Sequence, residues 1–251
     1  MLDVRDVRLS YGGVHAVNGV SLDVQEGEIV GLIGTNGAGK TSLFNVITGF
    51  TRGDAGTIRF LDNQIEGSSP AAIAASGMVR TFQTPIGFPK MTVLENMLVF
   101  SHKERSERRK LLGGARPDKA LIADALEILA EFRLDGRADI WVQDLSAPEM
   151  KMLEFARAMM ARPKLMLLDE PAAGVNPALM ENLEGHIRSL RDRGVTFLVV
   201  DHNLRFISAV CERTYAMADG KVIADGPTSD VIADPEVIRL YIGTGPGEAA
   251  A

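Results

Sequence analysis

The segment Gly34–Thr41 constrains the fold more than any other, because it follows the pattern G-x-x-x-x-G-K-[ST]. The apolar run Ile29–Ile33 precedes it and is typical of a buried strand. After it, apolar residues recur at helical spacing until Gly49, which favours a helix end (Leu43, Phe44, Val46, Ile47). The pattern therefore lies between a strand and a helix, where the backbone amides of a glycine-rich loop converge on an anion.

Each part of this loop has a predicted task toward a phosphate chain. The glycines allow a tight turn with the N–H groups pointing inward, and the helix N-terminus adds roughly half a positive charge. Lys40 is expected to reach the terminal phosphates, and the Thr41 hydroxyl to bind Mg²⁺. A glycine turn formed by chance is the alternative, and the flanking strand and helix argue against it. The sequence thus predicts a nucleotide-phosphate site.

Composition limits the class of protein around this loop. The chain has 251 residues, of which 46% are hydrophobic and 24% charged, as in a globular α/β protein. It has no apolar run of about 18 residues that could span a bilayer, and its charged start, Met1–Asp6, does not resemble a signal peptide. The net charge of −6 argues against broad nucleic-acid binding. A single cysteine, Cys211, excludes an internal disulfide and fits a reducing compartment.

A second strong motif ends another predicted strand. The apolar run Leu165–Leu168 is followed directly by Asp169 and Glu170. In a parallel nucleotide-binding sheet, the carboxyl ends of the strands face the ligand. Asp169 can then hold Mg²⁺ through water, and Glu170 can polarise an attacking water molecule. An acidic turn after a strand is the alternative, and the P-loop upstream makes it the weaker one.

Two residues have roles that their position in the sequence leaves open. Val195–Val200 is a largely apolar run, and His202 follows it, where the side chain either contacts a γ-phosphate or is structural. Tyr11 lies at the end of a predicted strand over residues 2–9, beside the turn at Gly12. It either stacks on a base or packs in the turn.

The pattern changes near residues 86–160. Thr92–Glu95 has the spacing of a capping box, Asp118 is predicted to cap a second helix, and Met150–Met159 indicates a third. The mixed-charge stretch His102–Lys110 is predicted to be a solvated helix face, with contact to a partner or to lipid headgroups as the alternative. The sequence thus predicts a helical insertion in a βα framework. Within that framework we expect strands at 17–24, 56–61 and 78–83, helices beginning at Pro70 and Pro177, a hairpin at Asp219–Gly220 and two short helices near the C-terminus.

These pieces in this order resemble the ATP-binding cassette of ABC transporters over residues 2–243. The resemblance implies an α/β fold: a P-loop NTPase core with an N-terminal antiparallel β-subdomain and an inserted α-helical subdomain. It implies a single ABC ATPase domain at 1–243, with the core and β-subdomain at 1–85 and 162–243. The helical subdomain is expected at 86–161, and a flexible tail at 244–251.

The family's site residues carry over to matching positions. The resemblance implies that Lys40, Glu170 and His202 take part in catalysis. Gln83 is similar to the glutamine that touches magnesium and links the helical subdomain to the active site. The implied contacts to ATP are Tyr11, Val17, Asn36, Gly37, Ala38, Gly39, Lys40, Thr41, Ser42 and Gln83. The implied contacts to Mg²⁺ are Thr41, Gln83 and Asp169.

Three segments, Arg80–Gln83, Met91–Asn96 and Pro171–Pro177, look most like the cassettes of branched-chain amino acid importers. Close relatives of these cassettes import urea, amides or other small solutes. The resemblance implies an ATPase at the cytoplasmic face of the cell membrane. Its implied partners are a second ABC ATPase subunit, transmembrane permease subunits and, indirectly, a solute-binding protein, with no nucleic acid. The alternatives are a regulatory cassette with little hydrolysis, a non-transport ABC ATPase and a small-molecule kinase.

One segment departs from the family. Leu145–Glu149 has the sequence LSAPE where the family signature is L-S-G-G-Q or a near variant. Ser146 and Glu149 have the spacing of a capping box, so the helix is expected to form. Pro148 removes an amide that could meet a phosphate, and Glu149 places a negative charge there. In the family this helix start crosses a dimer interface and contacts the γ-phosphate bound to the partner cassette. The resemblance therefore implies a heterodimer in which this signature serves a weakened second site.

Overall fold

The structure is a computed structural model, and it describes residues 1–81, 87–101 and 118–242. The chain forms two compact units, Met1–Met78 with Lys164–Ala251, and Val79–Pro163. The subdomain boundaries predicted near residues 86 and 161 stay predictions. Three predicted segments lie outside the described residues: the end of the extended segment at 82–83, the mixed-charge stretch 102–110 and the tail 244–251.

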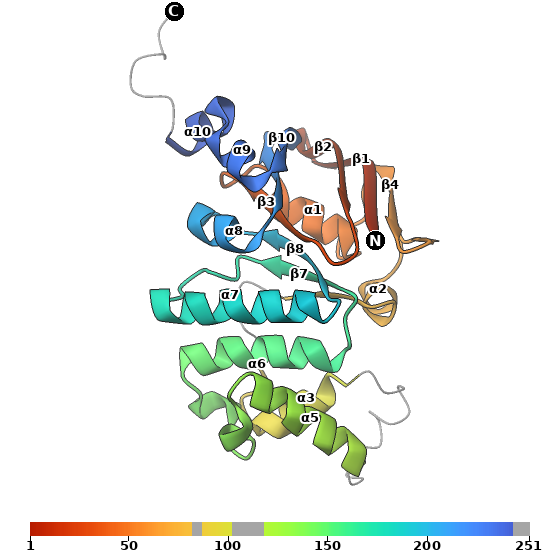
Figure 1. Ribbon diagram of the computed structural model, residues 1–251. Helices are drawn as coiled ribbons and strands as arrows, with labels where there is room; N and C mark the ends of the chain where they lie inside the picture. Colours follow the sequence, from red (N-terminus) through yellow and green to blue (C-terminus); the bar gives the residue numbers. More distant parts are fainter. Residues whose placement is uncertain (82–86, 102–117, 243–251) are drawn as a thin grey trace, which may run out of the picture. The chain divides into compact units, whose positions relative to one another are not determined.

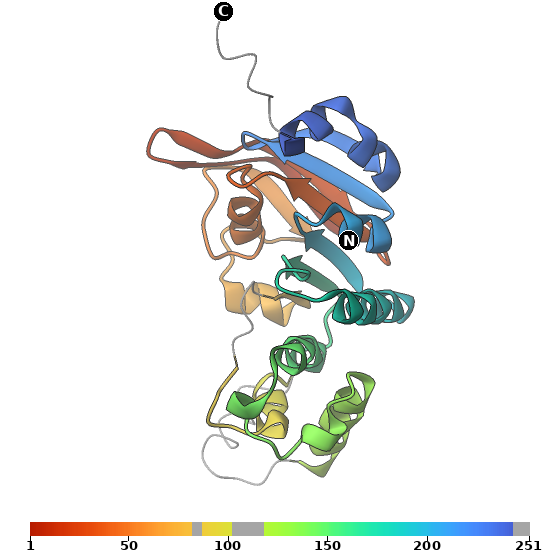
Figure 2. The same ribbon diagram turned by 90° about the vertical axis from the view of Figure 1, so that its left-hand side faces the viewer.

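The first unit contains an antiparallel sheet with the strand order β2-β1-β4-β5. β1 (Leu2–Tyr11) pairs with β2 (Val14–Val24) and with β4 (Ala55–Phe60), and β5 (Asn63–Gln64) is an edge strand. The predicted strands are confirmed, and β2 begins earlier than predicted, at Val14. Figure 2 shows the turn between β1 and β2, in dark red, projecting from the edge of this unit.

A second sheet has six strands in the order β10-β9-β3-β8-β7-β6. They are β3 (Ile29–Gly34), β6 (Met78–Arg80), β7 (Leu165–Asp169), β8 (Thr196–Val200), β9 (Arg213–Ala218) and β10 (Lys221–Pro227). β3 pairs in parallel with β8 and β9, β7 pairs in parallel with β8, and β9 and β10 form the predicted hairpin. Because β3, β7 and β8 are parallel, the segments that follow them emerge at one edge of the sheet.

Both faces of this sheet are buried. Alternate residues of β7 point to opposite faces, so Leu167 packs in the core shared with the antiparallel sheet and Met166 is buried on the other face. α1 (Lys40–Ile47) lies between the two sheets and contributes Phe44 to the shared core (Figure 1). Figure 2 shows α8, α9 and α10 on the opposite side of the sheet from α1. The remaining helices of this unit are α2 (Pro70–Ala75), α7 (Pro177–Asp192), α8 (Leu204–Val210), α9 (Thr228–Ala233) and α10 (Pro235–Ile242).

Side-chain caps set where the helices begin. The Asn176 side-chain oxygen accepts a hydrogen bond from the Leu179 amide at 2.9 Å, which confirms the predicted start of α7. Asn203 caps α8 in the same way, through the Phe206 amide at 3.1 Å. The sequence analysis assigns no helix there, because seven residues are too short to show a clear helical period.

Arg213 on β9 joins the two sheets of this unit. Its guanidinium donates to the Asp23 carboxylate at 3.1 Å, to the Asp23 carbonyl at 2.8 Å and to Glu28 at 2.9 Å. It also donates to the Tyr215 hydroxyl at 2.7 Å. Because Asp23 belongs to β2, this cluster fixes one sheet to the other through charge-assisted bonds.

Replacing Arg213 by Ala is expected to destabilise the first unit by about 1–3 kcal/mol, since hydrogen bonds to charged groups contribute about that much. Thermal unfolding is then expected to shift down by roughly 3–10 °C for a chain of this size. Arg5→Ala is the matched control, because Arg5 makes an exposed ion pair with Asp3 at 2.7 Å, and exposed pairs contribute little to stability. Equal unfolding midpoints for the two variants would mean that the Arg213 cluster does not stabilise the fold.

The second unit is helical, as predicted. Its elements are α3 (Val93–Val99), α5 (Lys119–Glu131), the 3₁₀ turns Asp135–Arg137 and Val142–Asp144, and α6 (Ala147–Met160). Thr92 and Ser146 both form the predicted capping boxes, and Asp118 caps α5. The three α-helices pack on one another. In the part of the chain that the structure describes, no helix is both long and apolar enough to cross a membrane.

Candidate active site

Glycines allow the loop between β3 and α1 to pack closely against two other strands. Gly39 has φ +99°, and a Cβ atom there would lie 2.1 Å from the Ala16 carbonyl oxygen on β2. Gly34 has φ +150°, and its Cβ would lie 2.3 Å from the Met217 carbonyl oxygen on β9. Neither distance is possible for a real side chain, so the loop holds this shape because glycine occupies both positions.

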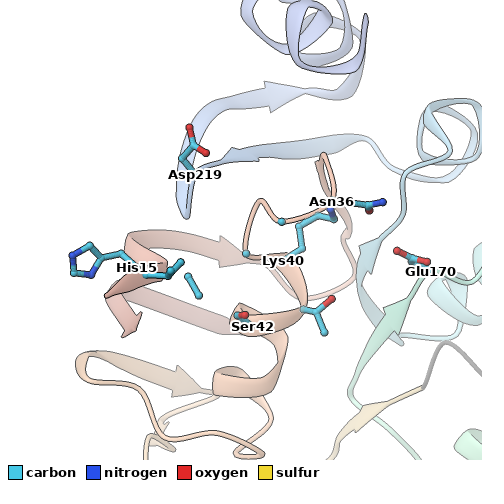
Figure 3. Close-up of a pocket in the computed structure, with 11 residues that line it drawn as sticks. His15, Asn36, Lys40, Ser42, Glu170 and Asp219 are labelled. Carbon is cyan, nitrogen blue, oxygen red and sulfur yellow. The ribbon is translucent and has the colours of Figure 1, made fainter. Parts of the chain in front are cut away.

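A cavity of about 430 Å³ opens above this loop, within the size range of small-molecule sites. Seven of the predicted residues line it: Asn36, Gly37, Gly39, Lys40, Thr41, Ser42 and Glu170. Four residues that the sequence analysis missed complete the wall: Val14, His15, Ala16 and Asp219. Figure 3 shows Asn36, Lys40 and Glu170 toward one end of the cavity and His15 at the other. The cavity is thus polar at the P-loop end, where phosphates are expected.

Lys40 is buried and bonded within the loop. Its ammonium group donates to the Gly34 carbonyl at 2.7 Å and to the Thr35 carbonyl at 2.9 Å. Burial lowers the pKa of Lys40, and the carboxylates of Glu170, Asp169 and Asp201 act in the opposite direction. Neutral carbonyls are weaker partners for an ammonium group than phosphate oxygens are. The arrangement therefore favours an incoming anion.

Asp169 and Glu170 lie at the carboxyl end of β7, as predicted. Asp169 is buried as the last residue of the strand. The Glu170 amide donates to the Val200 carbonyl at 2.8 Å, so the chain stays joined to β8 at this point. Glu170 has φ +49°, a left-handed conformation that is unfavourable for a residue other than glycine. Strain of this kind is typical of functional sites, where it aims a side chain.

His202 lies beside Glu170 at the same edge of the sheet. Its Nδ1 is 3.9 Å from a Glu170 carboxylate oxygen and 3.8 Å from an Asp201 oxygen, beyond hydrogen-bond range. The His202 side chain is 58% exposed, so it remains accessible to a ligand. The structure therefore brings Lys40, Asp169, Glu170 and His202 to one region of the first unit.

Asp201 is a residue that the sequence analysis did not select. It is fully buried, and its two oxygens accept hydrogen bonds from the Ala172 and Asn203 amides, each at 2.9 Å. It thereby ties the loop after β7 to the loop after β8, and so fixes Glu170 relative to His202. The available signal was an acid directly after an apolar strand, the same signal that identified Asp169.

Among the described residues, three predicted contacts to ATP do not line the cavity, and neither do Asp169 and His202. Tyr11 is 52% exposed and pairs with Val14, which does line it. Val17 is 1% exposed and packs in the core, because strand alternation turns Ala16 toward the cavity instead. Ala38 is buried in the same core. Gln83 lies outside the described residues.

The oxygen atoms that the protein offers near the P-loop suit magnesium, which takes only some of its ligands from the protein. Among the residues that the structure describes, no group of three or more His, Cys, Asp or Glu side chains could hold a metal ion. Mg²⁺ keeps several water molecules and binds through one or two protein oxygens together with substrate phosphates. The hydroxyl of Thr41 and the carboxylate of Asp169 fit that requirement.

The segment Leu145–Glu149, which differs from the family signature, lies at the start of α6, where its polar groups bond to one another. The Ser146 amide donates to Glu149 Oε2 at 2.8 Å, and the Ser146 hydroxyl donates to the same oxygen at 2.6 Å. Arg137 pairs with the other oxygen at 2.8 Å. The Ser146 hydroxyl and amide, and then Arg137, lower the pKa of Glu149. The two donors of Ser146 are thus used inside the helix start.

Comparison with known proteins gives a consistent result. The model of a family described as "ABC transporter" matches residues 17–173. The "Probable branched-chain amino acid transport ATP-binding protein LivG" of Archaeoglobus fulgidus is 37% identical over 245 residues, covering 97% of this chain and 95% of the relative. The "High-affinity branched-chain amino acid transport ATP-binding protein LivG" of Salmonella typhimurium is 36% identical over 249 residues, with 97% and 98% covered.

Solved structures agree with these relatives. The ADP conformation of an ATP-binding cassette from an ABC transporter has a TM-score of 0.88 and 34% identity, covering 97% of this chain and 99% of that one. A nucleotide-free cassette has a TM-score of 0.87 at the same identity and coverage. The chain therefore has the P-loop NTPase fold of these cassettes.

Proposed function

Because this chain belongs to the ABC transporter family and is an ATPase, we propose that it powers an importer of branched-chain amino acids or a related small solute. The observation that carries this proposal is the cavity that Lys40 and Thr41 of the P-loop line together with Glu170, the residue directly after β7. The names of the relatives support the choice of solute, since they describe branched-chain amino acid transport.

The geometry supports a separate role for each residue in binding and hydrolysing ATP. Lys40 exchanges its loop carbonyls for phosphate oxygens, and the amides of the glycine-rich loop bind the phosphate chain. Thr41 and Asp169 would hold magnesium, which would supply positive charge to the phosphates. Glu170 orients and polarises the attacking water molecule, and His202 contacts the γ-phosphate. Gln83 is proposed as a further contact to magnesium.

The nucleoside end of the cavity is proposed to hold the adenosine. Tyr11 pairs with Val14 across the β1–β2 hairpin, and paired residues in an antiparallel sheet share a face. Because Val14 lines the cavity, we expect the ring of Tyr11 to lie on the side of the hairpin that faces the mouth of the cavity. An exposed aromatic ring there is suited to stacking on a base.

Cassettes of this family dimerise and work with transmembrane permease components. We place this chain at the cytoplasmic face of the membrane, bound to permease subunits and, through them, to a solute-binding protein. Its cassette partner is proposed to be a different chain. Glu149 supports this, because its carboxylate occupies both donors of Ser146 that would otherwise meet the partner's phosphate. This chain then supplies one complete ATP site and a weakened signature for the second.

Transport tests the proposed function directly. The chain is purified from membranes with whatever subunits accompany it, and the complex is reconstituted in liposomes that contain ATP. We expect ATP-dependent uptake of labelled leucine, and no uptake when Lys40 is replaced by Ala. ATP hydrolysis with uptake of urea or a small amide in place of leucine would reassign the solute. Hydrolysis without any co-purifying membrane subunit would contradict a role in transport.

The weakened site gives a second prediction. In a heterodimer whose main site is disabled by Glu170→Gln, the residual ATP turnover comes from the second site. Restoring the family signature with Pro148→Gly and Glu149→Gln is expected to raise this residual rate about tenfold, because freed phosphate donors each contribute at least that much. Glu127→Gln on α5 is the control and is expected to have no effect. An unchanged residual rate in the double variant would show that Glu149 does not limit the second site.

A further inference from the structure

Tyr241, near the end of α10, contacts the first residue of the P-loop. Its hydroxyl oxygen accepts a hydrogen bond from the Gly34 amide at 2.9 Å. Pairing of β3 with β8 ends at Leu32, opposite Val200, while pairing with β9 continues to Gly34, opposite Met217. A buried backbone amide needs a partner at such a strand end. A phenol from the far end of the chain supplies that partner here.

Gly34 is held on both sides. Its amide is bonded to Tyr241, and its carbonyl accepts the Lys40 ammonium group at 2.7 Å. The residue has no room to shift toward β9, because even a Cβ atom would meet the Met217 carbonyl at 2.3 Å. Only the two backbone rotations of Gly34 separate its amide from its carbonyl. A shift of the amide therefore also shifts the carbonyl that binds Lys40.

The position of Tyr241 is fixed by the helix that carries it. The Asp234 carboxylate accepts a hydrogen bond from the Glu236 amide at 2.7 Å at the start of α10. One turn along, Val237 is 1% exposed and anchors the helix. Tyr241 follows Val237 by four residues, so the two side chains share one face of the helix. The contact with Gly34 thus belongs to the packed face of α10.

The phenol is also kept neutral. Burial raises the pKa of Tyr241, the hydrogen bond from Gly34 acts in the opposite direction, and the Asp201 carboxylate raises it further. A neutral hydroxyl oxygen accepts from the Gly34 amide and retains its own proton for an acceptor. Asp201 is the buried residue that ties the loops after β7 and β8 together. Tyr241 is therefore close enough to interact with the P-loop, through Gly34, and with the charge of Asp201.

We propose that Tyr241 is a positioning residue of the nucleotide site, which fixes Gly34 and thereby sets where the Lys40 ammonium group meets a phosphate. The C-terminal helix α10 is then part of the ATP-binding machinery, although none of its residues up to Tyr241, whose side chains the structure describes, lines the cavity. This inference rests on the proposed role of the cavity as the ATP site. It concerns binding of the phosphate chain, so it predicts an effect on ATP affinity with little effect on the chemical step.

The first test replaces Tyr241 by Phe in the full chain and measures binding of a fluorescent ATP analogue. We expect the Kd to rise roughly three- to tenfold, the usual effect of losing one hydrogen bond. In the hydrolysing complex, KM is expected to rise by the same factor, with kcat within about twofold of wild type. The matched control is Tyr215→Phe, which removes a hydroxyl bonded to Asp23 and Arg213 from a buried side chain. It is expected to lower the unfolding temperature and leave the Kd for ATP unchanged.

The second test asks whether the effect passes through Lys40. In a Lys40→Ala background, Tyr241→Phe is expected to change the Kd by less than about twofold, since the group it positions is gone. An equal loss in both backgrounds would overturn the route through Lys40. An unchanged Kd for Tyr241→Phe alone, in a wild-type chain that binds ATP, would overturn the inference. Failure of the wild-type chain to bind ATP would instead contradict the proposed function.

Discussion

Glu170→Gln is expected to lower ATP turnover by about 10²–10⁴-fold, the usual contribution of a positioned general base. The amide keeps the size of the carboxylate but cannot accept a proton from the attacking water molecule. Glu170 occupies a left-handed backbone conformation at the wall of the cavity, and Gln tolerates that conformation equally. We therefore expect the Kd for ATP to stay within about twofold of wild type, because this residue contributes to chemistry and not to ground-state binding.

The measurement is phosphate release by the reconstituted complex, with nucleotide binding followed separately. Glu181→Gln, an exposed position on α7, is the control and is expected to leave both quantities unchanged. The weakened signature adds an asymmetry: Glu170→Gln in this chain is expected to abolish most turnover, whereas the same change in the partner cassette matters less. Equal losses from the two changes would count against the heterodimer with one weakened site.

Elements whose signals lie within a few neighbouring residues could be predicted from the sequence. The strand before Gly34, the helix after Lys40 and the capping boxes at Thr92 and Ser146 all depend on local spacing, and the structure contains them. The two acids at the carboxyl end of β7 could be placed at the P-loop edge because parallel strands present their carboxyl ends together. The helix α8 was missed because seven residues give little periodicity.

Contacts between distant segments could not be predicted in the same way. The turn at Asp219 reaches the cavity because Gly220 donates to the Ala38 carbonyl at 3.1 Å and accepts from the Asn18 amide at 2.7 Å. The bond between Tyr241 and Gly34 likewise joins opposite ends of the chain. Local propensity carries no information on such pairs. The β2 alternation that buries Val17 depends on register, and the bulges between β1 and β2 shift that register.

Gly39→Ala is expected to weaken ATP binding by more than about 100-fold, because it combines backbone strain with a collision that the site cannot relieve. The φ of +99° is one that an alanine rarely adopts, at a cost of about 1–2 kcal/mol. The added Cβ would lie 2.1 Å from the Ala16 carbonyl oxygen, which is backbone of β2 and cannot swing aside as a flexible side chain would. The loop must therefore move away from β2, and its backbone N–H groups no longer all point at the phosphates.

Gly194→Ala separates these two causes. Gly194 has φ +93°, nearly the same as Gly39, yet nothing lies within 4 Å of its added Cβ. It precedes the amino end of β8, whereas the P-loop follows the carboxyl end of the parallel strand β3. Gly194→Ala is expected to lower the unfolding temperature by a few degrees and leave the Kd for ATP unchanged. Titration with a fluorescent ATP analogue, alongside thermal unfolding, compares the two variants. If Gly39→Ala weakens ATP binding only as much as Gly194→Ala does, backbone strain alone explains the loss of affinity. The close packing of the P-loop on β2 is then not what shapes the phosphate site.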